Sequence, residues 1–229
     1  MRWLWNQVLI QPTILHMNRV ILFLLSVFCA LLVISSSWYL SRMHILSNRQ
    51  FPVSGPARES SLNEKLRSRA HDLRLYCTKM GFNNQVAFLA DMSLESGKNR
   101  FFVYDLTADS PLCSGLVAHG SCNETWLSGR KYGNTPGCGC TSLGRYKVGG
   151  SYTGRFGRAY RLYGLDSSNN NATRRNVVLH SFYAVPEEAV FPYPICQSLG
   201  CPMVAPGFFK RLQLTIDNSA KPIVLWIYE

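Results

Sequence analysis

The sequence is short of acidic residues. It holds 13 Asp and Glu against 24 Lys and Arg, which gives a formal net charge of +11. The excess is +7 over residues 1–79 and +4 over residues 80–229. The chain also lacks zinc-finger spacing, a helix-turn-helix pattern and the aromatic signature of RNA-binding domains, so nucleic acid is not an expected partner. Positive charge concentrated near the N-terminus instead favours contact with anionic lipid or an anionic cell-wall polymer.

The eight cysteines lack the paired spacing that is typical of structural zinc sites. One residue separates Cys138 from Cys140, and 55 residues then precede Cys196. We therefore expect no metal ion, and nothing in the sequence points to another cofactor.

Six cysteines remain for disulfides once Cys29, inside an apolar run, and Cys201, a candidate nucleophile, are set aside. Six cysteines allow fifteen pairings, so the connectivity does not follow from the sequence. A domain exported to an oxidising compartment is nevertheless expected to form some of them. The predicted pairs, in order of preference, are Cys113 with Cys122, on the two sides of the turn at residues 118–120, and Cys196 with Cys138 or Cys140.

An apolar run without charge covers residues 20–34 and continues through three serines into Trp38-Tyr39-Leu40. Its length and aromatic edge predict a transmembrane signal anchor over residues 20–40. A cleaved signal peptide is the alternative, because the three serines offer small residues before a cut. The flanking arginines, two before the run and three after it, would by themselves leave the C-terminal part in the cytoplasm.

Residues 41–79 are predicted to form a basic linker that contains one amphipathic helix. Pro52, Gly55 and Pro56 among serines and arginines indicate a flexible tether over residues 41–60. Ser61-Leu62-Asn63-Glu64 fits a capping box that would start the helix, and Gly81 would follow its end. Its apolar stripe, which we expect to dock on the main domain, consists of Leu62, Leu66, Leu73 and Tyr76.

Residues 80–229 are predicted to form a mostly β domain, a sandwich or barrel. Short runs rich in Val, Leu, Phe and Tyr alternate with clusters of Gly, Pro, Asn and Ser, such as Gly144, Gly149-Gly150 and Gly154. One further helix is expected at residues 205–212. The predicted strands are residues 85–92, 100–106, 114–120, 159–165, 176–185 and 222–228.

The stretch "ICQSLGCPM" holds the strongest candidate for chemistry, the thiol of Cys201. A thiol nucleophile needs a base, an exposed turn and backbone N–H groups for an oxyanion. Ser198, Leu199 and Gly200 supply the turn, and glycine leaves room for an approaching carbonyl. His180, in the apolar strand "NVVLHSF", is the candidate base. Buried histidines and thiols are common in protein cores, so these residues alone leave a purely structural role open.

The arrangement resembles the YkuD-like L,D-transpeptidases of bacterial cell walls. Their signature is a histidine followed, after a gap, by Ser/Thr-x-Gly-Cys, and here seventeen residues separate His180 from Ser198. The run from about residue 82 to residue 229 is more closely similar to the murein L,D-transpeptidase catalytic-domain subgroup. The matching pieces, in order, are "RFFVYDL", "VAHG", "TSLGRYKVGGSYTGRFGRAYRLYGLD", "NNNATRRNVVLHSFYAV" and "SLGCP".

The resemblance implies acyl transfer on peptidoglycan stem peptides. Cys201 would attack the carbonyl of the third stem residue with release of D-alanine, and His180 would take the thiol proton. The catalytic domain would then face the periplasm of a bacterial envelope, with the anchor at residues 20–40 in the inner membrane and residues 1–19 in the cytoplasm. The resemblance further suggests His119, Arg175, Ser142, Tyr146 and Tyr152 as substrate-cleft residues.

Two alternatives to transpeptidation stay open. An L,D-carboxypeptidase or endopeptidase would resolve the same thioester with water, and a non-catalytic peptidoglycan-binding module would consume Cys201 in a disulfide. The departures that keep them open are Leu199, where many relatives carry a ring, Ser181 directly after the base, and Pro202-Met203 after the nucleophile. Oligomeric state does not follow from the sequence.

Overall fold

A computed structural model describes residues 21–22, 24–37, 56–125 and 129–229. The chain divides into two compact units, Met1–Val53 and Ser54–Glu229. In the first, residues 21–22 and 24–37 are helical. Within the described ranges, no helix combines the length and the apolar character needed to cross a bilayer. The predicted cytoplasmic segment 1–19, both ends of the predicted anchor 20–40 and most of the predicted tether lie outside the described residues.

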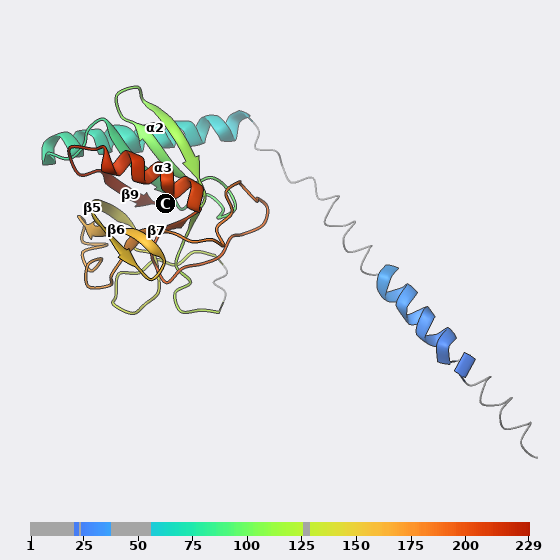
Figure 1. Cartoon of the computed structure of the whole chain (residues 1–229). Helices are drawn as coiled ribbons and strands as arrows, with labels where there is room; N and C mark the ends of the chain where they lie inside the picture. Colours follow the sequence, from blue (N-terminus) through green and yellow to red (C-terminus); the bar gives the residue numbers. More distant parts are fainter. Residues whose placement is uncertain (1–20, 23, 38–55, 126–128) are drawn as a thin grey trace, which may run out of the picture. The chain divides into compact units, whose positions relative to one another are not determined.

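The second unit is built on one nine-stranded sheet with the order β3-β2-β1-β9-β5-β6-β7-β8-β4 (Figure 1). The two outermost strands, β3 and β4, follow each other in the chain with only Leu116 between them. The sheet therefore curls until its edges approach, as in a nearly closed barrel. The strands are β1 (Val86–Asp91), β2 (Phe101–Asp105), β3 (Ser110–Gly115), β4 (Val117–Ala118), β5 (Gly144–Gly154), β6 (Gly157–Gly164), β7 (Val178–Ser181), β8 (Met203–Val204) and β9 (Val224–Tyr228).

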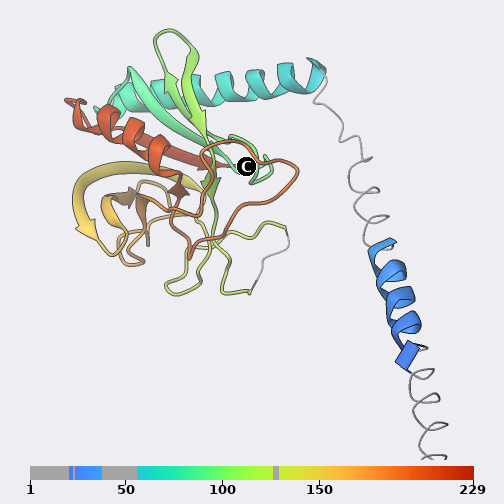
Figure 2. The ribbon, with the colours of Figure 1, turned by 45° about the vertical axis from the view of Figure 1, so that its right-hand side comes forward.

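Two helices cover the sheet from opposite sides (Figure 2). Successive side chains of a strand point to opposite faces, and β1 is apolar on both. Its Leu89 packs with Leu73 of helix α2 (Pro56–Met80), whereas its Phe88 belongs to the cluster around Phe208 of helix α3 (Pro206–Asp217). The mostly β architecture predicted from the sequence is confirmed.

Helix α2 starts earlier than the capping box predicts. It begins at Pro56, five residues before Ser61, because proline at a first helical position costs no hydrogen bond and already has a helical φ. The expected docking of its stripe is confirmed, since Leu66 and Leu73 are buried against the sheet. It ends at Met80, and Gly81 follows with φ +75°.

Strand β5 is the main element that the sequence reading missed. Its glycines resemble turn residues, yet Gly144–Gly154 forms an eleven-residue strand that pairs with β6 and β9. A bulge between Val148 and Ser151 absorbs Gly149-Gly150. Gly149 is needed for packing, because a Cβ there would lie 2.3 Å from the Tyr163 ring. Helix α3 also runs five residues past its predicted end.

Candidate active site

The turn that carries Cys201 lies between a short bridge at Ser198 and strand β8. Ser198 forms a parallel bridge with Gly120, donating its N–H to His119 O at 2.8 Å and accepting from Ser121 N at 2.8 Å. The Gly200 N–H donates to Ser198 Oγ at 3.0 Å. Leu199 projects outward, 77% exposed. A tight, internally bonded turn thus holds the residues on both sides of Gly200.

Only glycine suits position 200. Its φ is +109°, a region that other residues rarely adopt. A Cβ there would lie 2.5 Å from Cys140 O and 2.9 Å from an Arg175 guanidinium nitrogen. The turn is therefore pressed against the 138–142 segment and Arg175, and this contact orients Cys201.

Cys201 is a free, half-buried thiol. Its Sγ lies 3.9 Å from the backbone oxygen of Asn176, and the backbone of Val178 also bonds to the sulfur. Burial raises the pKa of the thiol, while the Val178 contact and the positive charge of Arg175 act in the opposite direction. At neutral pH the thiol is therefore protonated, and a base is needed to activate it.

His180 lies on β7, which pairs with β8 in parallel so that His180 faces Met203, two residues after Cys201. The ring is buried, and Phe156 stacks on it with centroids 5.2 Å apart. Its Nδ1 lies 2.9 Å from Ser181 O. Because a carbonyl only accepts, Nδ1 carries the proton and Nε2 is left with its lone pair. Burial lowers the pKa of His180, so the neutral form prevails at pH 7.

Cys201 and His180 lie on neighbouring elements. Within the described part of the chain, no hydrogen bond joins the Cys201 thiol to the His180 ring. Such contacts are often long in an enzyme without substrate and close when it binds.

Arg175, Ser142 and Tyr146 form one network under the Cys201 turn. The Arg175 guanidinium donates to Gly133 O at 2.9 Å and also to Ser142 Oγ and Cys140 O. Tyr146 is fully buried and donates its hydroxyl to Ser142 O at 2.8 Å, and burial raises its pKa to about 12. Arg174 and Arg175 lie in the turns before β7 rather than on a strand, and only Arg175 points inward.

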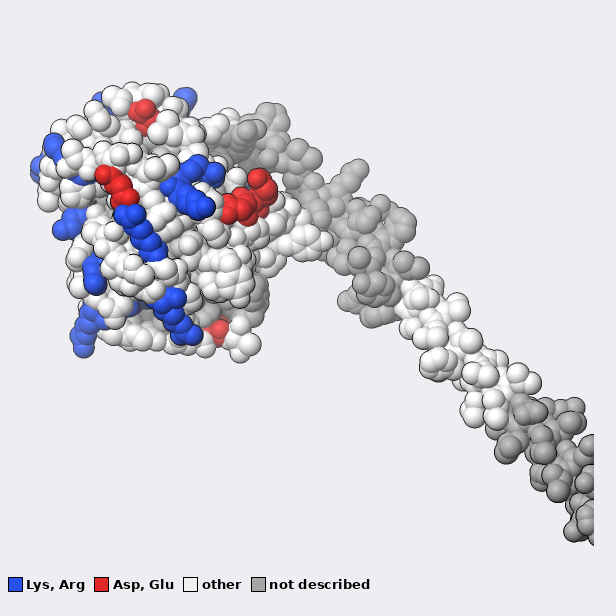
Figure 3. Space-filling view, viewed as in Figure 1, with Lys and Arg blue, Asp and Glu red and all other residues white. Residues whose placement is uncertain are grey.

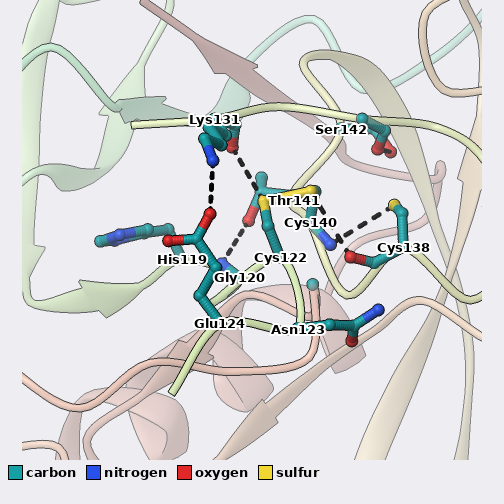
Figure 4. Close-up of a disulfide and its surroundings, with 12 residues drawn as sticks. His119, Gly120, Cys122, Asn123, Glu124, Lys131, Cys138, Cys140, Thr141 and Ser142 are labelled. Carbon is teal, nitrogen blue, oxygen red and sulfur yellow. Dashed lines mark hydrogen bonds and ion pairs between the residues drawn. A yellow bond between two sulfur atoms is a disulfide. The ribbon is translucent and has the colours of Figure 1, made fainter. Parts of the chain in front are cut away.

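The disulfide differs from the sequence prediction. Cys122 pairs with Cys140, and the two Cα atoms are 4.2 Å apart (Figure 4). Cys113, the expected partner of Cys122, lies on β3 at the opposite sheet edge and is free. Cys138 and Cys196, the weaker predicted pair, are free as well. Proximity in sequence to the 118–120 turn misled the prediction, because the segment around Cys140 returns to that turn only in the folded chain.

The Cys122–Cys140 disulfide links the two segments that support Cys201, residues 119–122 and 138–142. Gly120 N donates to Thr141 Oγ1 at 2.9 Å, and Cys122 N donates to Gly139 O at 3.1 Å. One of these segments carries the bridge to Ser198, and the other supplies Cys140 O to Arg175. The disulfide therefore belongs to the framework of the site.

His119 has a supporting partner that the sequence did not reveal, Arg100. Arg100 is 1% exposed and donates to Val117 O twice, to Leu94 O, and to His119 Nδ1 at 3.0 Å. An arginine only donates, so Nδ1 of His119 accepts, and burial with the Arg100 charge lowers the pKa of His119 to about 4. His119 is thus a neutral, fixed residue whose backbone positions Ser198. A buried arginine leaves no pattern in the sequence that distinguishes it from an exposed one.

No cluster of His, Cys, Asp and Glu suited to a metal ion occurs within the described parts of the chain.

A profile of the L,D-transpeptidase catalytic domain matches residues 59–228. No curated protein sequence matches the chain. Among solved structures, an L,D-transpeptidase (residues 123–326) from Xylanimonas cellulosilytica is 14% identical, with 67% of this chain and 68% of that one covered and a TM-score of 0.36. The Ldtfm–avibactam carbamoyl enzyme is 12% identical, with coverages of 63% and 49% and a TM-score of 0.38.

The helical cell shape determining protein Pgp2 from Campylobacter jejuni is 11% identical, with 73% of this chain and 55% of that one covered and a TM-score of 0.37. The chain thus spans about half the length of the last two proteins. The family profile, in contrast, covers nearly all of the compact unit Ser54–Glu229. The chain belongs to the L,D-transpeptidase catalytic domain family.

Proposed function

We propose that the chain catalyses cysteine-dependent acyl transfer on peptidoglycan stem peptides. The observation that carries the proposal is the free thiol of Cys201, which lies on a glycine turn directly before β8. Strand β8 pairs with β7, and β7 carries the neutral, buried ring of His180. Among the described residues, Cys201 takes part in no disulfide, which supports catalysis over a binding module that would consume this thiol in one. Figure 3 shows Lys and Arg spread over the face drawn, with fewer Asp and Glu, which suits an anionic wall polymer.

In the first step, His180 Nε2 takes the thiol proton and the Cys201 sulfur attacks the carbonyl of the third stem residue. The bond from that carbonyl carbon to the nitrogen of D-alanine breaks, and the proton leaves with the amine. Gly200 N–H is bonded to Ser198 Oγ, so the proposed oxyanion donors are the N–H groups of Leu199 and Cys201.

In the second step, an amine of another stem attacks the thioester and restores the thiol. His180 accepts the proton of that amine and returns it to sulfur. Transfer to the amine joins two stems, whereas attack by water would release a shortened stem.

The test is intact-mass analysis of the protein after incubation with a tetrapeptide stem ending in D-alanine, beside Cys201→Ala. We expect a tripeptide acyl adduct and free D-alanine from the parent protein alone. Cross-linked dimer after addition of an acceptor stem assigns transfer, and free tripeptide alone assigns hydrolysis. A folded protein with a free Cys201 thiol and an intact Cys122–Cys140 disulfide that yields neither adduct nor D-alanine contradicts the proposal.

This function requires the catalytic unit to be outside the cytoplasm, and residues 20–40 are the proposed inner-membrane anchor. Protease added to intact spheroplasts should then degrade the unit. In cells that are fractionated without protease, the protein should sediment with the membrane fraction. Degradation only after lysis would contradict an external location, and a soluble, shortened protein would indicate signal cleavage.

A further inference from the structure

A hollow of about 210 Å³ lies on the outer face of strands β5, β6 and β7. Its lining includes Tyr152, Arg161, Tyr163, Thr173, Asn176 and Val178. Tyr152 was expected at the substrate cleft from the family resemblance, whereas Arg161 and Asn176 were not singled out by the sequence.

The hollow adjoins the proposed nucleophile. Asn176 and Val178, which line it, are also the two residues whose backbones contact the Cys201 sulfur. Asn176 has φ +54°, and this left-handed conformation lies at the end of the turns that lead into β7. The hollow and the Cys201 thiol therefore have two neighbouring residues in common.

The hollow also shares a sheet face with His180. In the β6–β7 pairing, Arg161 lies opposite Val178 and Ala159 lies opposite His180. Cross-strand partners, and residues two apart on one strand, project to the same face. Leu179 points the other way, into the core. Arg161 and His180 thus project from diagonally related positions on one face.

Arg161 supplies an unneutralised positive charge there. Its guanidinium lies over the Tyr152 ring, 4.6 Å from the centroid, and within the described parts of the chain it has no ion-pair partner. Arg175 uses its guanidinium on Cys140, Ser142 and Gly133, and Arg158 pairs with Asp217 at 2.8 Å. Arginine presents a planar fork that matches a carboxylate, and stacking on tyrosine holds that fork in place.

We infer that this hollow is a subsite for a carboxylate of the donor stem peptide, with Arg161 as its anion-binding residue, an inference that rests on the proposed function. A stem ending in D-alanine offers two sources of this chemistry. One is the terminal carboxylate, which leaves with D-alanine, and the other is the side-chain carboxylate of a diamino acid such as diaminopimelate at the third position. Tyr152, over whose ring the guanidinium lies, and Tyr163 both line the space for the bound residue.

The first experiment measures binding without chemistry, by calorimetry of a tetrapeptide stem with the full chain carrying Cys201→Ala. Adding Arg161→Gln should weaken binding by about tenfold, as expected for loss of one charge-assisted hydrogen-bonded pair. Arg161→Lys should recover part of it. Lys210→Gln, which removes one exposed charge on α3, is the matched control and should leave the affinity unchanged.

Peptide variants assign the source. If the terminal carboxylate occupies the hollow, a C-terminal amide should bind the parent as weakly as the acid binds Arg161→Gln. If the side-chain carboxylate occupies it, lysine in place of diaminopimelate should have that effect. Equal affinity of Arg161→Gln and the parent for the tetrapeptide, with both proteins folded, would overturn the inference.

Acylation of proteins with intact Cys201 separates this result from the proposed function. Absence of any adduct with unchanged, Arg161-dependent binding would refute the catalytic proposal and keep the subsite. Normal adduct formation together with binding that does not depend on Arg161 would keep the catalytic proposal and refute the subsite.

Discussion

Gly200 is a position where one added methyl group should disturb the proposed site. Gly200→Ala would place Cβ 2.5 Å from Cys140 O at φ +109°. We expect loss of stability of about 1–3 kcal/mol and at least a tenfold slower acyl-adduct formation, because the turn must shift. Thermal unfolding and intact mass measure the two effects.

Gly150→Ala is the matched control for this substitution. A Cβ at Gly150 would meet nothing within 4 Å, and its φ is not in the left-handed region. Adduct formation at the parental rate in Gly200→Ala would show that the turn geometry is not needed for the reaction.

The buried ring of His180 predicts a pH dependence. The imidazole acts as a base only when neutral, and burial lowers its pKa below 6.5. Adduct formation should therefore be retained at pH 6.5 and fall only as pH drops below that value. Phe156→Ala uncovers the ring, so the fall should move toward higher pH.

The measurement is the adduct rate across pH 4–8 for parent and variant. Tyr193→Ala removes an aromatic ring that is 69% exposed and serves as the control. A fall at the same pH in Phe156→Ala and parent would show that the stacked ring does not set the protonation of His180.

At the scale of elements, the disulfide joins two loops that belong to no helix or strand. Replacing Cys122 and Cys140 together by alanine opens a loop with a sequence separation of 18. We expect the free energy of unfolding to fall by about 2–4 kcal/mol, and adduct formation to slow because Gly120 and Arg175 lose their shared support. Denaturant unfolding and intact mass test this prediction.

Cys113→Ala provides the control, since Cys113 is free on β3. Peptide mapping of the oxidised protein should recover the 122–140 link. Recovery of a 113–122 link instead would contradict the pairing and restore the expectation drawn from the sequence.

For the whole molecule, α2 packs on the sheet within the compact unit Ser54–Glu229. Leu73 is fully buried against the sheet, and Leu75, two residues on, is 57% exposed. Leu73→Ala should lower the free energy of unfolding by about 2–5 kcal/mol, because a cavity opens between α2 and β1. Leu75→Ala should change it by less than about 0.5 kcal/mol.

Chemical denaturation of the compact unit checks both values. Equal stability of the two variants would show that α2 detaches without cost. In that case the fold would reside in residues 80–229, the boundaries that the sequence predicts for the catalytic domain.

Local patterns in the sequence identified most elements and the two residues of the proposed chemistry. Alternating and continuous apolar runs predicted β1, β2, β6, β7 and β9, because those strands bury their side chains. Spacing between His180 and the Ser-x-Gly-Cys turn indicated the family, because the residue types and their separation match the family's signature. The glycines of β5 led to a wrong prediction of turns. Gly149 and Gly150 lie instead in a β-bulge, where the Tyr163 ring leaves no room for a side chain at Gly149.

The amino-acid sequence by itself determined the mostly β class and the family, and it singled out Cys201 and His180 for the proposed chemistry. Only the tertiary structure decided which cysteines form a disulfide. It also decided that Arg175 is used in hydrogen bonds inside the protein, whereas Arg161 has no ion-pair partner among the described residues. Three pairs of residues that are distant along the chain illustrate this: Cys122 with Cys140, Arg100 with His119, and Arg161 with Val178. Their proximity follows from sheet curvature and loop return, which depend on packing of the whole core and leave no local pattern.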